Sequence, residues 1–363
     1  MAVTNPSDDY RAVRYEGAGI INLSARRGRL LVSGRDAAMF LNGLVTNDVK
    51  NLAHGSWIAA AFANVQGRLI AAVRIIHRTD GFLIDTERVT HSKVLDLLSR
   101  FTLAGDFRVT DLTDELGTLS LQGKKSADIL ASVLGEEAAV LERGRVLEST
   151  FNEKEVTIIR ATHTAEEGFD LFIESSAREQ LHDALWHAGA EIVKDETLEI
   201  LRIEAGIPRY GVDMNENTVV SETCLDDAIS DKKGCYVGQE IIIRIKHRGH
   251  VAKKMTGVML ETPWELEEHA EIISDDHKEI GHITSLTLSP CLDRQIALAY
   301  LKYDHLEDGM RVWVDRGEKQ VLAEVAALPM VRGSWFPADG VTEPGDEISE
   351  EPEDEISGEH EPV

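Results

Sequence analysis

Two segments of the chain share one order of apolar and polar positions. Residues 30–41 give a short apolar strand, Gly34 and an apolar helical run, and residues 119–130 repeat this order around Gly123. The two glycines lie 89 residues apart, which is 123 minus 34. Two copies predict two related α+β subdomains rather than a solenoid, which needs three or more units. Chance recurrence of a common strand–helix unit is the alternative.

Further patterns predict the other elements of these subdomains. The alternation of apolar residues predicts strands at 69–76, 82–85 and 168–173. Apolar residues at helical spacing predict an amphipathic helix at 177–189 and a second helix from about 196 to 205.

The segment 241–246 alternates isoleucine with polar residues. In a strand, Ile241, Ile243 and Ile245 share one face, and Arg244 and Lys246 share the other. The pattern therefore predicts a strand with a buried apolar face and a cationic face that can meet an anion. A plain solvated face is the alternative. The cationic strip continues with Arg248, Lys253 and Lys254.

Short alternating runs also dominate the C-terminal third, from about residue 257 onward. Turn residues separate the runs, and this spacing predicts a small antiparallel barrel or sandwich. The runs lie at 258–260, 280–283, 296–300, 312–314 and 321–325.

The charge of the chain is strongly negative, at −26. This charge argues against general nucleic-acid binding, because a duplex would be repelled. Residues 341–363 carry ten of the acidic side chains together with three prolines. Such a segment cannot bury enough apolar surface to order itself, so we expect a disordered acidic tail.

Several classes of protein are disfavoured. No apolar run approaches the roughly 20 residues that span a bilayer, and residues 1–16 lack the apolar core of a secretory signal. We therefore expect a cytoplasmic protein without membrane partners. The three cysteines, at 224, 235 and 291, form no Cys-x-x-Cys pair, so we expect neither a disulfide framework nor a dedicated metal site.

Candidate chemistry is concentrated in the segment 232–240, Lys-Lys-Gly-Cys-Tyr-Val-Gly-Gln-Glu. Cys235 follows two lysines, and cationic neighbours favour the thiolate. Gly234 and Gly238 flank the thiol at a spacing that predicts an irregular turn. Cys235 is therefore a candidate reactive thiol, and a buried structural cysteine is the alternative.

The Lys-Gly-Cys-Tyr-x-Gly-Gln-Glu motif resembles the signature of the YgfZ family, the folate-binding relatives of the glycine-cleavage T-protein. The resemblance extends over about 28–330, through the segments 34–49, 201–211 and 280–300. It implies an α+β, T-protein-like fold with two related α+β N-terminal subdomains and a C-terminal antiparallel β-barrel. The implied divisions are a lead-in at 1–27, a folate-binding region at 28–250, a barrel at 251–335 and an acidic tail at 336–363.

The resemblance also implies a site. The cofactor would be tetrahydrofolate or a folate derivative, bound in a cavity between the N-terminal subdomains with Cys235 at its rim. Glu204 matches the family glutamate that holds the pterin ring. The glutamyl tail of folate is one candidate anion for the cationic strip. The implied site residues are Cys235 as the functional thiol with Lys233, and Glu204, Asn47, Asp48, Tyr236 and Arg244 as cofactor-binding residues.

Three functions remain open at this stage. The YgfZ resemblance implies support for the assembly or repair of iron–sulfur clusters, with iron–sulfur client or assembly proteins as partners. The second is a folate-dependent aminomethyltransferase or related one-carbon transferase. Ala71 and Ala72 stand where the T-protein carries adjacent aspartates, and alanine cannot take a proton, which disfavours this second function. The third is a scaffold that only binds a partner.

Overall fold

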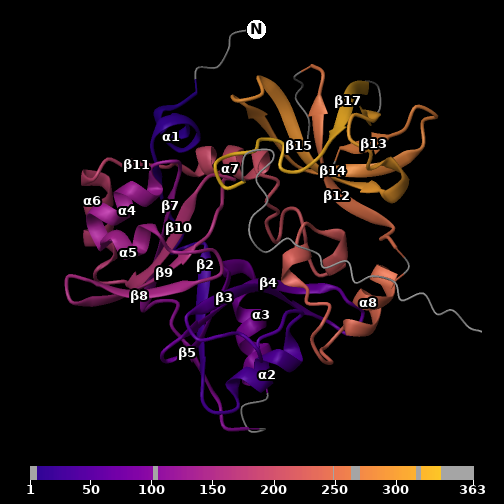
Figure 1. Ribbon diagram of the computed structural model, residues 1–363. Helices are drawn as coiled ribbons and strands as arrows, with labels where there is room; N and C mark the ends of the chain where they lie inside the picture. Colours follow the sequence, from indigo (N-terminus) through magenta and orange to yellow (C-terminus); the bar gives the residue numbers. More distant parts are fainter. Residues whose placement is uncertain (1–5, 101–104, 248, 263–269, 316–319, 337–363) are drawn as a thin grey trace, which may run out of the picture.

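The computed structural model describes residues 6–100, 105–247, 249–262, 270–315 and 320–336. Figure 1 shows three lobes around a common centre: two α+β lobes from the N-terminal part of the chain, and a barrel from the C-terminal part. The acidic tail predicted from the sequence lies outside the described residues.

The first lobe is an antiparallel sheet in the order β3-β4-β5-β2-β6, with two helices against it. Apolar side chains from both helices and the sheet, including Leu41, Val94 and Ile75, form one buried cluster. Its elements are β2 (Arg27–Ser33), α2 (Ala37–Leu44), β3 (Ser56–Ala63), β4 (Leu69–Arg78), β5 (Gly81–Glu87), α3 (Arg88–Ser99) and β6 (Arg108–Asp111).

The second lobe contains a six-stranded sheet in the order β11-β1-β7-β10-β9-β8. Leu130 and Leu181, from its helices, pack on Leu121 and Leu171 of the sheet. Its elements are β1 (Gly19–Asn22), β7 (Leu116–Gln122), α4 (Ser126–Leu134), α5 (Glu136–Ala139), β8 (Val146–Phe151), β9 (Lys154–Arg160), β10 (Gly168–Glu174), α6 (Arg178–His187) and β11 (Glu191–Ile192).

The two lobes are copies of one plan. The order β3-β4-β5-β2 in the first sheet corresponds to β8-β9-β10-β7 in the second. Gly34 and Gly123 end the equivalent strands with φ of 113° and 130°, a conformation that favours glycine. A Cβ atom would lie 2.5 Å from Asp106 O at Gly34 and 2.6 Å from Gly17 O at Gly123. The prediction of two related α+β subdomains is confirmed.

The C-terminal barrel is also confirmed. Its strands close in the order β12-β15-β14-β13-β16-β17, around a core that includes Val258, Ile283 and Val312. The strands are β12 (Lys253–Leu260), β13 (Glu271–Ile273), β14 (Glu279–Ser289), β15 (Arg294–Lys302), β16 (Arg311–Asp315) and β17 (Gln320–Ala326), with a 3-10 turn at Tyr303–His305.

The remaining elements connect the lobes. Helix α7 (Asp195–Glu204) contacts the barrel strands β14 and β15. The N-terminal elements are α1 (Asp8–Arg11) and a π-helical turn (Ala12–Glu16), and the later connectors are 3-10 turns at Val220–Glu222 and Asp226–Ala228 and helix α8 (Gln239–His247). Within the described residues, no helix combines the length and the apolar character needed to cross a membrane.

The strand predicted at 241–246 is wrong, because this segment lies in α8. Gly238, with φ of 85°, turns the chain so that Ile242 becomes buried among Leu69, Val220 and Tyr236. This packing outweighs the strand preference of the isoleucines. Arg244 therefore does not belong to a cationic strand face. It is exposed and pairs with Glu240 one turn away, at 2.5 Å.

Candidate functional site

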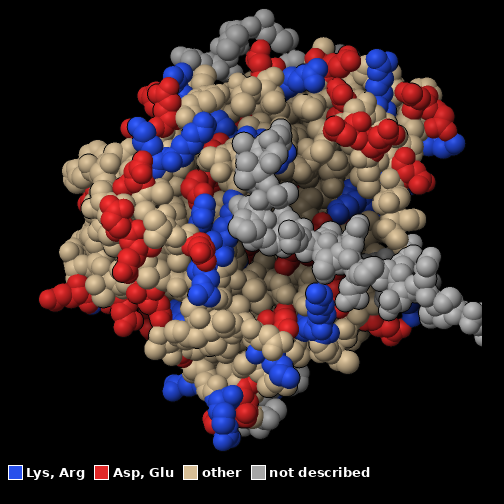
Figure 2. Space-filling model, viewed as in Figure 1, with Lys and Arg blue, Asp and Glu red and all other residues tan. Residues whose placement is uncertain are grey.

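A central cavity of about 530 Å³ lies where the three lobes meet. Figure 2, viewed from the same side as Figure 1, shows a hollow near the centre of the molecule. Ligand pockets in proteins commonly measure about 300–1,000 Å³. Each lobe and the connecting segments contribute to the wall, for example Trp57, Ala72, His163, Pro208, Asp227 and Leu328.

Strand β4 forms one wall of the cavity. Successive side chains of a strand point to opposite faces. Ala72, Val73 and Arg74 line the cavity, whereas Ala71 is fully buried in the core of the first lobe. The alanine that replaces one of the family aspartates therefore faces the cavity, and it supplies no ionisable group there.

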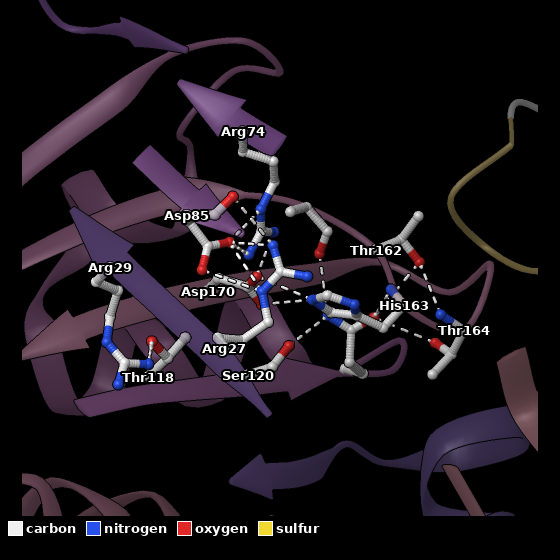
Figure 3. A network of polar contacts seen from close by, with 12 residues as sticks. Arg27, Arg29, Arg74, Asp85, Thr118, Ser120, Thr162, His163, Thr164 and Asp170 are labelled. Atoms are coloured by element: carbon white, nitrogen blue, oxygen red, sulfur yellow. Dashed lines mark hydrogen bonds and ion pairs between the residues drawn. The ribbon is translucent and has the colours of Figure 1, made fainter. Parts of the chain in front are cut away.

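Buried ion pairs connect the two N-terminal lobes beside this wall (Figure 3). Asp85 accepts hydrogen bonds from Arg27 and Arg74, and Arg74 also donates to Asp170 on β10 at 2.5 Å. Burial alone would raise the pKa of Asp85, but the two arginines outweigh it and hold this pKa below its ordinary value. The network fixes Arg74 between the lobes.

His163 also lies on the wall, in the loop between β9 and β10. Its Nε2 atom is 2.9 Å from Asp170 Oδ2 and 3.1 Å from Asp170 Oδ1. Burial would raise the pKa of Asp170, but His163 and Arg74 lower it well below its ordinary range. Asp170 is therefore a carboxylate at neutral pH, and it orients the imidazole.

Two carboxylates on the wall can accept hydrogen bonds from a ligand. Glu87 lies at the end of β5, and its Oε1 atom accepts a hydrogen bond from the backbone nitrogen of Tyr210 at 3.0 Å. Burial raises the pKa values of both Glu87 and Asp227. The flat side chains of Trp57 and Trp335 also line the cavity. The wall therefore combines acceptors with surfaces on which a planar ring can stack.

Lys233 is buried, at 7% exposed. Its Nζ atom donates to the carbonyl oxygens of Asn42, Val45 and Asn47, at 2.8, 2.6 and 2.7 Å. Burial lowers the pKa of Lys233 to about 8, and nearby Asp48 opposes this change. Lys233 therefore attaches the motif segment to the first lobe.

Cys235, two residues later, is exposed. A Cβ atom on neighbouring Gly234 would meet no atom within 4 Å, so the chain beside the thiol is open. Cys224 differs because it lines the central cavity, and burial raises its thiol pKa to about 11. The arrangement presents Cys235 to solvent and shields Cys224.

The loop before β3 approaches the motif and the cavity wall. The Asn47 amide donates to the carbonyl oxygens of Ala59 and Asp227, at 2.8 and 3.0 Å. Asp48 accepts from the Asn51 side chain at 2.7 Å. Tyr236 is buried, and burial raises its pKa to about 12. The structure thus brings together Asn47, Asp48, Lys233 and Tyr236 of the predicted site, whereas Arg244 is on the outer part of α8.

Glu204 lies in a separate, buried network. Its Oε2 atom accepts from Arg14 at 2.6 Å, and its Oε1 atom accepts from Tyr10 at 2.7 Å and Ser289 at 2.5 Å. The side chain is fully buried and is not among the residues that line the central cavity. Protein donors already contact both oxygens, so Glu204 connects the lobes, and its predicted role in folate binding stays a prediction.

Sequence reasoning missed Arg74, Asp85, His163 and Asp170. The available signal was a charged residue inside an otherwise apolar strand, as at Arg74 in β4 and Asp170 in β10. Charged groups are seldom buried unless they are paired. Among the described residues, no group of three or more His, Cys, Asp or Glu side chains could hold a metal ion.

Comparison with known proteins identifies the family. Residues 4–233 match the GCVT N-terminal domain, and residues 253–332 match the glycine cleavage T-protein C-terminal barrel domain. The chain belongs to the glycine cleavage T-protein family. The folate cofactor expected from the sequence agrees with this family.

The relatives are similar over nearly their whole length. An aminomethyltransferase of Rubrobacter xylanophilus is 31% identical over 325 residues, which are 89% of this chain and 86% of the relative. An aminomethyltransferase of Bacillus pumilus is 26% identical over 90% of each chain. The crystal structure of glycine cleavage system aminomethyltransferase T from Bartonella henselae superposes with a TM-score of 0.81 at 20% identity, over 91% of this chain and 90% of that one.

Proposed function

We propose that this protein binds tetrahydrofolate or a folate derivative in the central cavity. The observation that carries the proposal is the cavity itself, whose wall combines aromatic surfaces with the carboxylates of Glu87 and Asp227. A carboxylate accepts both donors of an amino-pyrimidine edge, so these two residues are the ones we expect to hold the pterin. They take the role that the sequence resemblance implied for Glu204.

The proposed activity is a tetrahydrofolate-dependent one-carbon transfer of the aminomethyltransferase type. The names and full-length similarity of the relatives support this activity. Bound tetrahydrofolate would supply the nitrogen atoms that carry the one-carbon unit. The protein would supply the acceptors at Glu87 and Asp227 and the fixed cations at Arg27 and Arg74.

A second candidate function is support for the assembly or repair of iron–sulfur clusters in client enzymes, as in the YgfZ branch. Two observations favour it. Cys235 is exposed within the motif that carries the YgfZ resemblance. Ala72, which stands where the sequence resemblance implies a T-protein aspartate, lines the cavity. In this function Cys235 is the essential group, and folate binds in the same central cavity.

A paired assay separates the two functions. The purified protein is given tetrahydrofolate and an aminomethyl donor, and a deletion strain is complemented with wild type or Cys235→Ser and assayed for cluster-containing enzymes. One-carbon transfer predicts turnover that survives Cys235→Ser. The iron–sulfur function predicts no turnover, low cluster-enzyme activity in the deletion strain, and rescue by wild type alone. A protein that does neither, and binds no tetrahydrofolate, would be the scaffold.

A further inference from the structure

Ala72 supplies no ionisable group to the central cavity. His163, in the loop between β9 and β10, does supply one. Arg74, two residues along the same face of β4, donates to Asp170, and Asp170 binds His163. Both Ala72 and His163 line the central cavity. A histidine can accept and return a proton near neutral pH, which alanine cannot.

The hydrogen bonds to Asp170 define which nitrogen of His163 is available. Because Asp170 is a carboxylate, it accepts, so the Nε2 atom of His163 carries the proton. In the neutral ring the Nδ1 atom then has a free lone pair. No hydrogen bond to this atom comes from the residues that the structure describes. The imidazole side chain is 19% exposed, which is sufficient for contact with a ligand.

Buried hydrogen bonds hold the His163 loop in place. Gln122 is fully buried, and its Oε1 atom accepts from the His163 backbone nitrogen at 2.9 Å. The same oxygen accepts from the hydroxyl groups of Thr162 and Thr164, and the Gln122 amide donates to Ala161 O at 3.0 Å. Figure 3 shows His163 directed towards the ion-pair network from this loop. The imidazole is thus positioned before any ligand arrives.

The charges that face His163 come from several elements. Arg27 of β2 and Arg74 of β4 are cationic, but both bind Asp85 of β5. Asp170 of β10 offsets the remaining cationic character through direct contact. Glu87, the last residue of β5, lines the central cavity together with His163. Both residues also line a second cavity of about 370 Å³, whose wall includes the cationic side chains of Arg26, Arg88, Arg202 and Arg209. The direct partner of a protonated His163 is therefore the Asp170 carboxylate.

We propose that His163, oriented by Asp170, is the proton-exchanging residue of the central cavity. This inference rests on the proposed one-carbon transfer. The Nδ1 atom accepts a proton from the nucleophilic group of the substrate as that group forms its new bond. Asp170 stabilises the imidazolium through Nε2–H. The same proton passes from Nδ1 to the departing group, which leaves with its bonding pair, so no oxidant or reductant is needed.

The test combines imidazole NMR with kinetics on wild type, His163→Gln and Asp170→Asn. A matched control is His91→Gln. His91 also pairs with an aspartate, Asp111 at 3.1 Å, but lines none of the cavities described above. We expect the neutral His163 ring to carry its proton on Nε2. Asp170→Asn should lower the share of the Nε2–H tautomer, because the carboxylate that accepts from Nε2 is lost.

Tetrahydrofolate should shift the imidazole resonances of His163 and leave those of His91 unchanged. His163→Gln should lower kcat by about 10²- to 10⁴-fold, remove the fall in rate on the acid side and leave the tetrahydrofolate affinity within about threefold. A protonated Nδ1, or full rate and an unchanged acid limb in His163→Gln, would overturn the inference. If Asp170→Asn does not fold, the His163→Gln result decides. Wild type that binds no tetrahydrofolate would overturn the proposed function instead.

Discussion

Arg14 and Glu204, 190 residues apart in the chain, form a buried ion pair in which Arg14 Nη2 lies 2.6 Å from Glu204 Oε2. The side chains are 3% and 0% exposed. Arg14 also binds Glu166 at 2.8 Å, and Glu204 binds Ser289 of the barrel. The pair therefore links the N-terminal segment, the second lobe, α7 and the barrel.

Glu204→Gln should lower the free energy of unfolding by about 3 kcal/mol, because removing one partner of a buried pair leaves the other charge poorly compensated. Urea denaturation measures the change. Glu240→Gln, which breaks an exposed pair on α8, is the control and should change stability by at most about 0.5 kcal/mol. Native stability combined with lost tetrahydrofolate binding in Glu204→Gln would return this carboxylate to the ligand site.

Cys235 should react with a thiol reagent before Cys291 and Cys224. Cys235 and Cys291 are both exposed, but partial burial of the thiol raises the pKa of Cys291, and burial raises that of Cys224 to about 11. Less thiolate means slower alkylation at neutral pH. Peptide mapping after brief alkylation gives the order. Melting of Cys235→Ser should match wild type, and early labelling of Cys224 would contradict the arrangement described.

The free energy of unfolding of wild type, relative to that of Lys233→Met, should rise with pH. The pKa of Lys233 is about 8 in the folded protein and 10.5 ordinarily. Between these values the unfolded chain binds the proton and the folded chain does not, so unfolding takes up a proton and becomes less favourable as pH rises. Urea denaturation of both proteins at pH 7.5 and 10 measures the trend. A wild-type advantage that shrinks over this range would contradict the burial of the ammonium.

The glycines of the internal repeat should be equally intolerant of a side chain. Gly34→Ala and Gly123→Ala should each lower the free energy of unfolding by about 2 kcal/mol or more, because strain at positive φ adds to a backbone clash. Gly135 also has positive φ, at 95°, but has no atom within 4 Å of a Cβ position. Gly135→Ala should therefore cost only about 1 kcal/mol. Equal effects at all three positions would show that the close approach is unimportant.

The sequence predicted the fold well because local patterns carry it. Period-two alternation marked the barrel strands, and the glycines at 34 and 123 marked the repeat. It failed at 241–246, where alternating isoleucines indicate a strand, because the burial of Ile242 after the turn at Gly238 depends on residues distant in the chain. The residue limits of the predicted domains and the assignment to the YgfZ branch stay predictions.

The candidate site was harder to predict. The motif located exposed Cys235 and buried Lys233 in one segment, but spacing alone gave both lysines the same role beside the thiol. Glu204 was placed by resemblance, and its three protein partners come from parts of the chain that no local pattern connects. His163 and Asp170 are seven residues apart, yet only the β9–β10 pairing and the Gln122 contacts turn them into a pair on the cavity wall.

Titration calorimetry with tetrahydrofolate on cavity-filling variants tests whether the central cavity is the folate site. Ala72→Trp places bulk in the central cavity, and Ile243→Trp places the same side chain in a groove beside α8. We predict that wild type and Ile243→Trp bind with equal affinity, whereas Ala72→Trp, folded by circular dichroism, binds at least about 100-fold more weakly, a loss of about 2.7 kcal/mol. No binding by wild type, or equal binding by Ala72→Trp, would contradict a folate site in the central cavity.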